Sequence, residues 1–184
     1  MDELTQLAEL LKKKNAIDSL ISAQLGRAAE KGHVGEFIAS QVFDIQLHPS
    51  ASFKASDGCF RSGPRAGRTV NIKWYAKQDD LLDLPINGAA DGLPNYYLVL
   101  TGPQTKAKIT HRPWVITAVY LFNAQQLVAQ LQEQGKRIGI ATGVNKFLWE
   151  AAEIYPDQKV ELPPYRRINR RSFAFLRPAN AHLL

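Results

Sequence analysis

The sequence predicts an α/β domain with helices on both sides of a central sheet. Three observations lead to this prediction: apolar residues recur at helical spacing up to about residue 45, short apolar runs bounded by glycine and proline follow, and strand-like and helix-like segments alternate from residue 114. A chain of 184 residues is long enough to bury a core of its own. We expect one domain over residues 1–155 and an extended basic arm over residues 156–184.

Two helical segments open the chain. Leucine and isoleucine recur every three or four positions over residues 2–25, where Asn15 or Asp18 divides the pattern into two helices and Gly26 fits a C-terminal cap. The next helix is predicted for residues 32–45, GHVGEFIASQVFDI. Its apolar stripe leaves Glu36 on a different face, beside small residues that allow a helix to approach a sheet closely.

The middle of the chain alternates like β-structure. Residues 68–75, RTVNIKWY, place Val70, Ile72 and Trp74 on one side of a strand and Asn71, Lys73 and Tyr75 on the other. Residues 96–101, YYLVLT, form a continuous apolar run that is typical of a central strand. Residues 114–122 predict a further strand.

The last third of the chain predicts a helix, a strand and a second helix. Asn123 is an N-cap candidate for the first of them, with a capping-box partner three residues later. Residues 138–142 predict a short strand, and the helix that follows runs to Tyr155, where Pro156 stops it. The arm beyond contains two prolines and clustered arginines.

Composition excludes several classes of protein. Cys59 is the only cysteine, which rules out an intramolecular disulfide framework and a zinc–cysteine cluster. No apolar run approaches the roughly 20 residues that span a bilayer, and the first residues lack the apolar region of a signal peptide. We therefore expect a cytoplasmic protein that does not bind membranes.

The distribution of charge indicates a polyanionic partner. The formal net charge is +6, and basic residues gather in two segments, 54–77 and 155–184. The alternative is an ordinary solvated basic surface. Arg61, Arg65 and Arg68 lie in or beside the predicted hairpin turn, and Tyr75 shares a face with Lys73. These four residues are candidate nucleic-acid contacts, together with four in the arm: Arg166, Arg167, Arg170 and Arg171.

One group of polar residues suits phosphodiester hydrolysis. Asn71 and Lys73 share one face of a strand, and a hairpin brings Asp57 beside them. Glu36, on the preceding helix, is placed to reach over the strands. Carboxylate and amide oxygens are the ligands that Mg²⁺ prefers, and a lysine stabilises charge that develops on a phosphate or positions the attacking water. Glu36, Asp57 and Asn71 are therefore the expected metal ligands.

With these residues the sequence resembles the PD-(D/E)xK nuclease superfamily. Asp57 matches the first acid of its pattern, Asn71-Ile72-Lys73 matches the acid-x-Lys element, and Glu36 matches the helical glutamate. The segments GHVGEFIA, SDG and VNIKWY, with the later YYLVLTGP and RPWVI, also look like a little-characterised bacterial family of such nucleases. The resemblance implies a restriction-endonuclease-like fold, a mixed central sheet flanked by helices, Mg²⁺ with Mn²⁺ as a substitute, a DNA substrate, and a homodimer.

Asparagine at position 71 departs from the pattern, which has an acid there. An amide oxygen is a weaker metal ligand and carries no charge, so Glu36 would have to supply the second carboxylate beside Asp57. Two alternatives stay open. One is an inactive nucleic-acid-binding module on the same fold, and the other is a protein whose basic arm binds an acidic partner.

Overall fold

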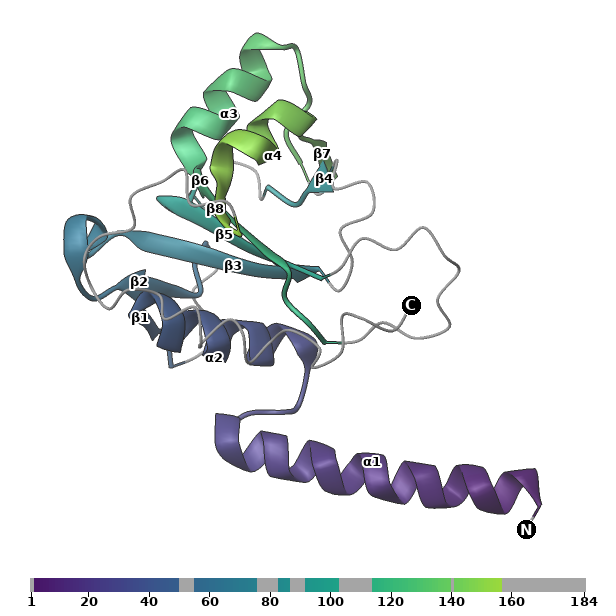
Figure 1. Cartoon of the computed structure of the whole chain (residues 1–184). Coiled ribbons are helices and arrows are strands. Elements are labelled where there is room, and N and C mark those ends of the chain that lie inside the picture. The colour runs from purple at the N-terminus through teal and green to yellow at the C-terminus, as the bar shows by residue number, and fades with distance from the viewer. Residues whose placement is uncertain are drawn as a thin grey trace.

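A computed structural model describes residues 2–49, 55–75, 83–86, 92–102, 114–139 and 141–156 of the chain. It confirms the α/β class: helices pack on both faces of a mixed sheet (Figure 1). The helices are α1 Glu3–Leu25, α2 Lys31–Phe43, α3 Ala124–Glu133 and α4 Lys146–Ala152, with a 3-10 turn at Gly63–Arg65. The strands are β1 Ile45–Leu47, β2 Gly58–Phe60, β3 Thr69–Tyr75, β4 Asp83–Leu84, β5 Tyr96–Thr101, β6 Ala118–Asn123, β7 Thr142–Gly143 and β8 Glu153–Tyr155.

The main sheet has six strands in the order β1-β2-β3-β5-β6-β8. Only β3 and β5 are parallel, and every other neighbouring pair is antiparallel. Strands β4 and β7 form a separate two-stranded sheet. Strand β3 is therefore central: a hairpin joins it to β2 on one side, and a longer connection brings β5 to its other side.

The two faces of the sheet bury two apolar clusters. Helix α2 covers one face, where its Ala39 meets Val70, Ile72 and Trp74 of β3. Helices α3 and α4 cover the opposite face, where Leu127 and Trp149 pack with aromatic side chains of the sheet. The predicted alternation of β3 is thus confirmed, because its three apolar side chains all belong to the cluster under α2.

Helix α1 is a single helix, so the prediction that Asn15 or Asp18 divides it is wrong. Asp2 accepts a hydrogen bond from the Thr5 amide at its start, and Gly26 caps its end with a φ of 67°. Asp18 pairs with Lys14 one turn earlier, which supports the helix where a break was expected. Among the described residues, no helix is both long and apolar enough to cross a bilayer.

Three predicted boundaries in the last third of the chain are corrected. Strand β6 begins at Ala118 rather than at residue 114, and among the described residues of the segment 138–142 only Thr142 joins a strand. Helix α4 ends at Ala152, and the next three residues form β8, which pairs with the edge of β6. The predicted arm, with Arg166, Arg167, Arg170 and Arg171, lies beyond residue 156 and outside the described residues.

Candidate active site

Strand β3 loses its partner on one side within the described part of the chain. It pairs with β5 along its whole length, from Val70↔Tyr96 to Tyr75↔Thr101. Its pairing with β2 ends at Gly58↔Val70. From Asn71 onward, no described strand lies on the β2 side, so backbone groups at this edge need other partners.

Asp57 occupies this edge. Its amide donates to the Val70 carbonyl at 2.9 Å, and its carboxylate accepts from the Ile72 amide at 2.5 Å. The next residue, Gly58, packs so closely on β1 that a Cβ atom there would clash with the carbonyl oxygen of Gln46. The hairpin therefore holds Asp57 in place, as the sequence predicted. Burial raises the pKa of its carboxyl group, although the Ile72 hydrogen bond and the charge of Lys73 oppose that rise.

Glu36 reaches the same edge from helix α2. A Cβ atom at the preceding residue, Gly35, would lie 3.1 Å from Cβ of Trp74, so the helix approaches β3 closely at this point. Burial raises the pKa of Glu36, and the neighbouring charge of Asp57 raises it further. Arg27 and Lys73 lower it. Glu36 therefore lies within electrostatic range of both Asp57 and Lys73.

Arg27 is a component of the site that the sequence did not predict. Its guanidinium lies 2.9 Å from the Glu36 carboxylate and donates to the His48 carbonyl at 2.8 Å. It comes from the link between α1 and α2, directly after the Gly26 cap. No motif marks the residue, because its contacts depend on how α1, α2 and β1 come together in space.

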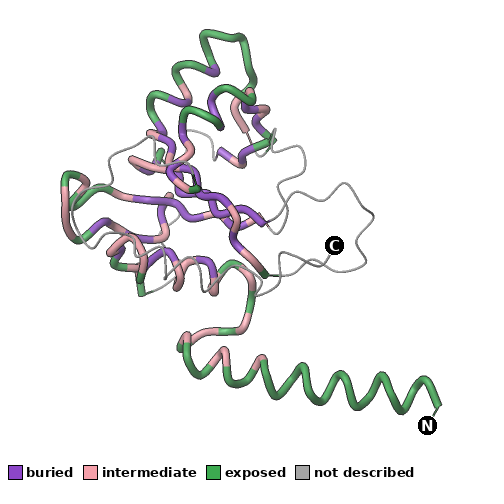
Figure 2. The backbone as a smooth tube through the Cα atoms, in the orientation of Figure 1, coloured by how far each residue is buried: buried purple, intermediate pink, exposed green. Residues whose placement is uncertain are grey.

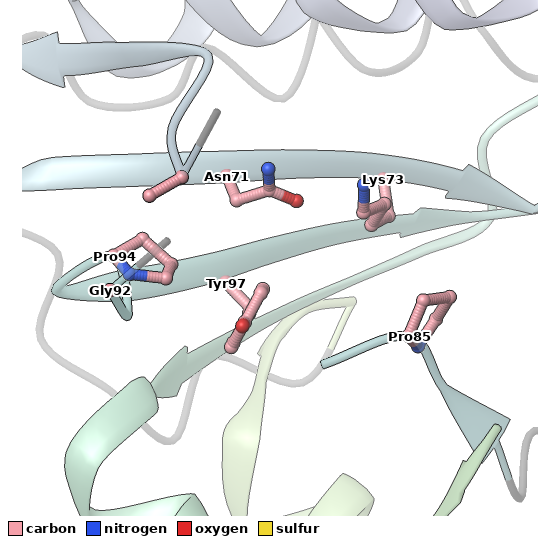
Figure 3. Close-up of a pocket in the computed structure, with 7 residues that line it drawn as sticks. Asn71, Lys73, Pro85, Gly92, Pro94 and Tyr97 are labelled. Carbon is pink, nitrogen blue, oxygen red and sulfur yellow. The ribbon is translucent and has the colours of Figure 1, made fainter. Parts of the chain in front are cut away.

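Lys73 and Asn71 point into a pocket between β3 and the loops around it. Figure 3 shows them side by side on β3, with Tyr97 of β5 beside them. The residues that line the pocket are Ala55, Asn71, Lys73, Pro85, Gly92, Pro94 and Tyr97. The Oδ1 atom of Asn71 is buried and has no hydrogen-bond partner, and Lys73, which is half-buried, forms no ion pair within the described residues.

The four predicted site residues do not all share one face of the sheet. Asn71 and Lys73 face the α3 and α4 side with Tyr97, whereas Glu36 belongs to α2 on the opposite side. Asp57 lies at the edge between them and connects the two groups electrostatically. The structure thus brings together the three charged residues and places Asn71 beside Lys73.

The donor atoms fit Mg²⁺ in kind. The charge of Asp57 raises the cost of ionising Glu36, and the buried amide oxygen of Asn71 has no hydrogen-bond partner in the described chain. A hard cation would stabilise the two carboxylates and accept an amide oxygen as a ligand. Mg²⁺ commonly binds through one or two carboxylates and keeps several waters. No cluster of three or more His, Cys, Asp or Glu side chains suited to a metal occurs in the described ranges. Asn71 would have to serve as a third ligand.

The candidate nucleic-acid contacts in the hairpin lie away from this edge. Arg61 pairs with Asp44 at 2.7 Å, and the guanidinium of Arg65 lies 5.6 Å from the centre of the Tyr96 ring. At about 3.3 Å per residue, the hairpin carries Arg61 about 13 Å along the strand from Asp57. Arg68 donates its amide to the Arg65 carbonyl within the same turn.

Tyr75, the other candidate contact, is part of the core. It packs against the apolar cluster under α3 and α4, and its buried hydroxyl has no partner among the described residues. Burial raises the pKa of Tyr75 to about 12. Its position on the Lys73 side of β3 is as predicted, but its ring is largely occupied by packing.

A scan of protein-family models found no match to this chain, and a search of curated proteins found none either.

Proposed function

We propose that this chain is a Mg²⁺-dependent nuclease that hydrolyses phosphodiester bonds of DNA, on a restriction-endonuclease-like fold. One observation carries the proposal: half-buried Lys73 forms no ion pair in the described chain and lines the same pocket as Asn71, whose buried amide oxygen has no hydrogen-bond partner there. A half-buried lysine without an ion pair in the described chain suits an anionic ligand such as a phosphate.

The remaining residues have distinct roles in this proposal. Glu36 and Asp57 would hold Mg²⁺, and Asn71 would add a neutral oxygen. A bound Mg²⁺ polarises a phosphate and lowers the pKa of a water molecule. Lys73 would contact the non-bridging oxygens of the phosphate and stabilise the charge that develops on them. The raised pKa of each carboxyl group supports this assignment, since perturbed acids cluster at functional sites.

A nucleic-acid-binding module without catalysis is the second candidate, and one contact favours it. Arg27 supplies Glu36 with the positive charge that a metal would otherwise supply. With asparagine at position 71, strand β3 itself contributes no carboxylate, and Asp57 reaches its edge from the hairpin. In this alternative, Lys73 binds a backbone phosphate and no bond is broken.

Plasmid cleavage in Mg²⁺ or Mn²⁺ tests the first proposal. Lys73→Met keeps the length of the side chain and removes its charge, so cleavage should fall at least about 100-fold. Metal binding, followed by calorimetry, should persist, because an ammonium group is not a metal ligand. Lys146→Met is the matched control: Lys146 is exposed and pairs with Glu150 of its own helix. Equal cleavage by both variants would refute the assignment of Lys73.

A double-mutant cycle tests whether Glu36 and Asn71 share one ion. Glu36→Gln should weaken Mg²⁺ binding and Asn71→Asp should strengthen it. If both side chains hold one ion, Asn71→Asp should strengthen binding more in the Glu36→Gln background than in the unaltered protein. Strictly additive effects would show that the two side chains do not share a metal. Arg27→Gln extends the cycle, because releasing Glu36 from its ion pair should strengthen Mg²⁺ binding.

DNA binding without cleavage or metal binding would support the second candidate. In that case Lys73→Met should reduce DNA affinity and flatten the slope of log K against log salt by about 0.9, the value for one phosphate contact. Fluorescence anisotropy with a labelled duplex at several salt concentrations measures both quantities. No binding by the unaltered protein would exclude both candidates.

A further inference from the structure

The first fifteen residues of α1 project from the rest of the protein. Every residue from Asp2 to Ile17 is exposed, and the first half-buried position is Asp18 (Figure 2). In Figure 1 the N-terminal part of α1 extends beyond the end of α2. This projecting part carries four exposed leucines: Leu4 (75% exposed), Leu7 (51%), Leu10 (61%) and Leu11 (49%).

The four leucines lie on one side of the helix. At about 100° per residue, Leu7 and Leu10 form the centre of a stripe, and Leu4 and Leu11 lie along one edge of it. Glu3 and Lys14 continue the same stripe at its two ends. A helical segment of this length is marginal in water without packing, and leucines so exposed are normally covered by another surface.

We propose that this stripe is covered by the same stripe of a second copy of the chain, with the two helices antiparallel. In one register the four leucines and the two end residues find suitable partners, and the exposed Ile17 lies beyond the overlap. Leu7 meets the partner's Leu10, Leu4 meets the partner's Leu11, and Glu3 meets the partner's Lys14. The two-fold axis repeats each of these contacts, as a self-complementary interface requires.

The charges of Glu3 and Lys14 favour antiparallel over parallel helices. With parallel helices, Glu3 would face Glu3 and Lys14 would face Lys14, which is repulsive. With antiparallel helices, both ends of the stripe carry opposite charges. Lys14 also pairs with Asp18 of its own helix, so its ammonium lies between two carboxylates in the dimer.

The contact is confined to the projecting part. Ile21 and Leu25 continue the apolar pattern, but they are already half-buried against the rest of the chain. The overlap of residues 3–14 is about 18 Å long at 1.5 Å per residue. An interface of this size belongs to the weak end of specific interfaces, so we expect a reversible dimer that dissociates on dilution.

Sedimentation equilibrium of the full chain, from about 10 µM to about 1 mM, covers the range of a weak dimer. We expect a monomer–dimer equilibrium that Leu7→Ala with Leu10→Ala weakens at least tenfold, about 1.4 kcal/mol or more. Because these side chains are exposed, the variant should keep the thermal midpoint of the domain. A monomer at every concentration, or a dimer that keeps its affinity in this variant, would overturn the proposal.

Charge exchange tests the orientation. Glu3→Lys and Lys14→Glu should each weaken the dimer, and the combined variant should restore it, since the opposite charges are then merely exchanged. Glu9→Lys and Lys12→Glu are matched controls on the other side of the helix, where the two residues pair with each other; they should leave the association constant unchanged. Single variants without effect, or no recovery in the combined variant, would exclude antiparallel pairing.

A lipid surface is the competing occupant, because three consecutive lysines, residues 12–14, follow the leucines. Flotation with vesicles of phosphatidylcholine and phosphatidylglycerol provides the test. The proposal predicts no leucine-dependent binding to these vesicles. A monomeric protein that floats with them and loses this property in Leu7→Ala with Leu10→Ala would overturn self-association.

Discussion

The close approach of α2 to β3 leads to a prediction about stability. A methyl group at Gly35 would lie 3.1 Å from Cβ and 3.2 Å from Cε3 of Trp74. Trp74 is 7% exposed and packs edge-on against Trp114, so it has little room to retreat. We expect Gly35→Ala to overpack this contact at a cost of about 1–3 kcal/mol, partly offset by about 1 kcal/mol of improved helix propensity.

Gly32→Ala is the matched control for this prediction. Gly32 lies in the same helix, and a Cβ atom there would meet nothing within 4 Å. The difference between the two variants in free energy of unfolding largely cancels the gain in helix propensity and leaves the packing cost of about 1–3 kcal/mol.

Urea denaturation of both variants measures this difference. Thermal scans should show it as a lower midpoint for Gly35→Ala, by about 2–4 °C for each kcal/mol in a protein of this size. Equal stabilisation of both variants would refute the reasoning, because α2 would then not press on Trp74. The placement of Glu36 would in that case need another explanation.

Four further variants have defined outcomes. Asp57→Asn should raise the free energy of unfolding at pH 7, since burial raises the pKa of Asp57 and its ionisation opposes folding. Urea titrations should show this gain shrinking once the pH falls below the raised pKa and vanishing below the pKa of the unfolded chain. A gain that persists in acid would contradict burial as the cause. Arg27→Gln should raise the pKa of Glu36 further, because it removes a neighbouring positive charge. NMR titration measures this pKa, and a lowered value would contradict the ion pair. Asn123→Ala should lower the free energy of unfolding in urea by about 0.5–2 kcal/mol, because it removes the N-cap of α3. An unchanged free energy would show that this cap does not form. Tyr75→Phe should remove one step near pH 12 from an alkaline absorbance titration and preserve stability, because its hydroxyl has no partner in the described chain; a marked loss of stability would reveal one.

Local patterns in the sequence predicted the centre of the fold. The alternation of Val70, Ile72 and Trp74 identifies β3, because one face of a strand that packs on a helix must be apolar. Asn123 identifies the start of α3, since its side chain accepts from the amide three residues later. Both signals depend only on neighbours in the chain, and both are confirmed.

Long-range contacts account for the errors in the fold. Residues 153–155 continue the helical pattern of α4, yet they form β8 because the edge of β6 offers unpaired backbone groups. Helix α1 passes through Asn15 and Asp18 without a break, because on an exposed helix a single ion pair offsets a modest loss of propensity. Neither outcome can be derived from the segment alone.

The candidate site was predictable only where it depends on local structure. A hairpin is a local structure, so the placement of Asp57 beside β3 follows from its turn residues. The small residues beside Glu36 predicted a close approach of its helix to the sheet. The contact that produces it, between Gly35 and Trp74, joins residues 39 positions apart and was not predicted. Arg27 was missed altogether, since a residue in a link between helices carries no pattern that names its partners.

The hydrogen bond between the Ile72 amide and the Asp57 carboxylate turns one backbone proton into a reporter on the site. The neighbouring amides of β3 that bond to β5 exchange with solvent only when the sheet opens, whereas the Ile72 amide is held by a group that titrates. Its chemical shift and exchange rate therefore follow the ionisation of Asp57. A cation that drew the carboxylate away would expose this proton to solvent, so one resonance would register occupancy of the site even where no catalysis occurs.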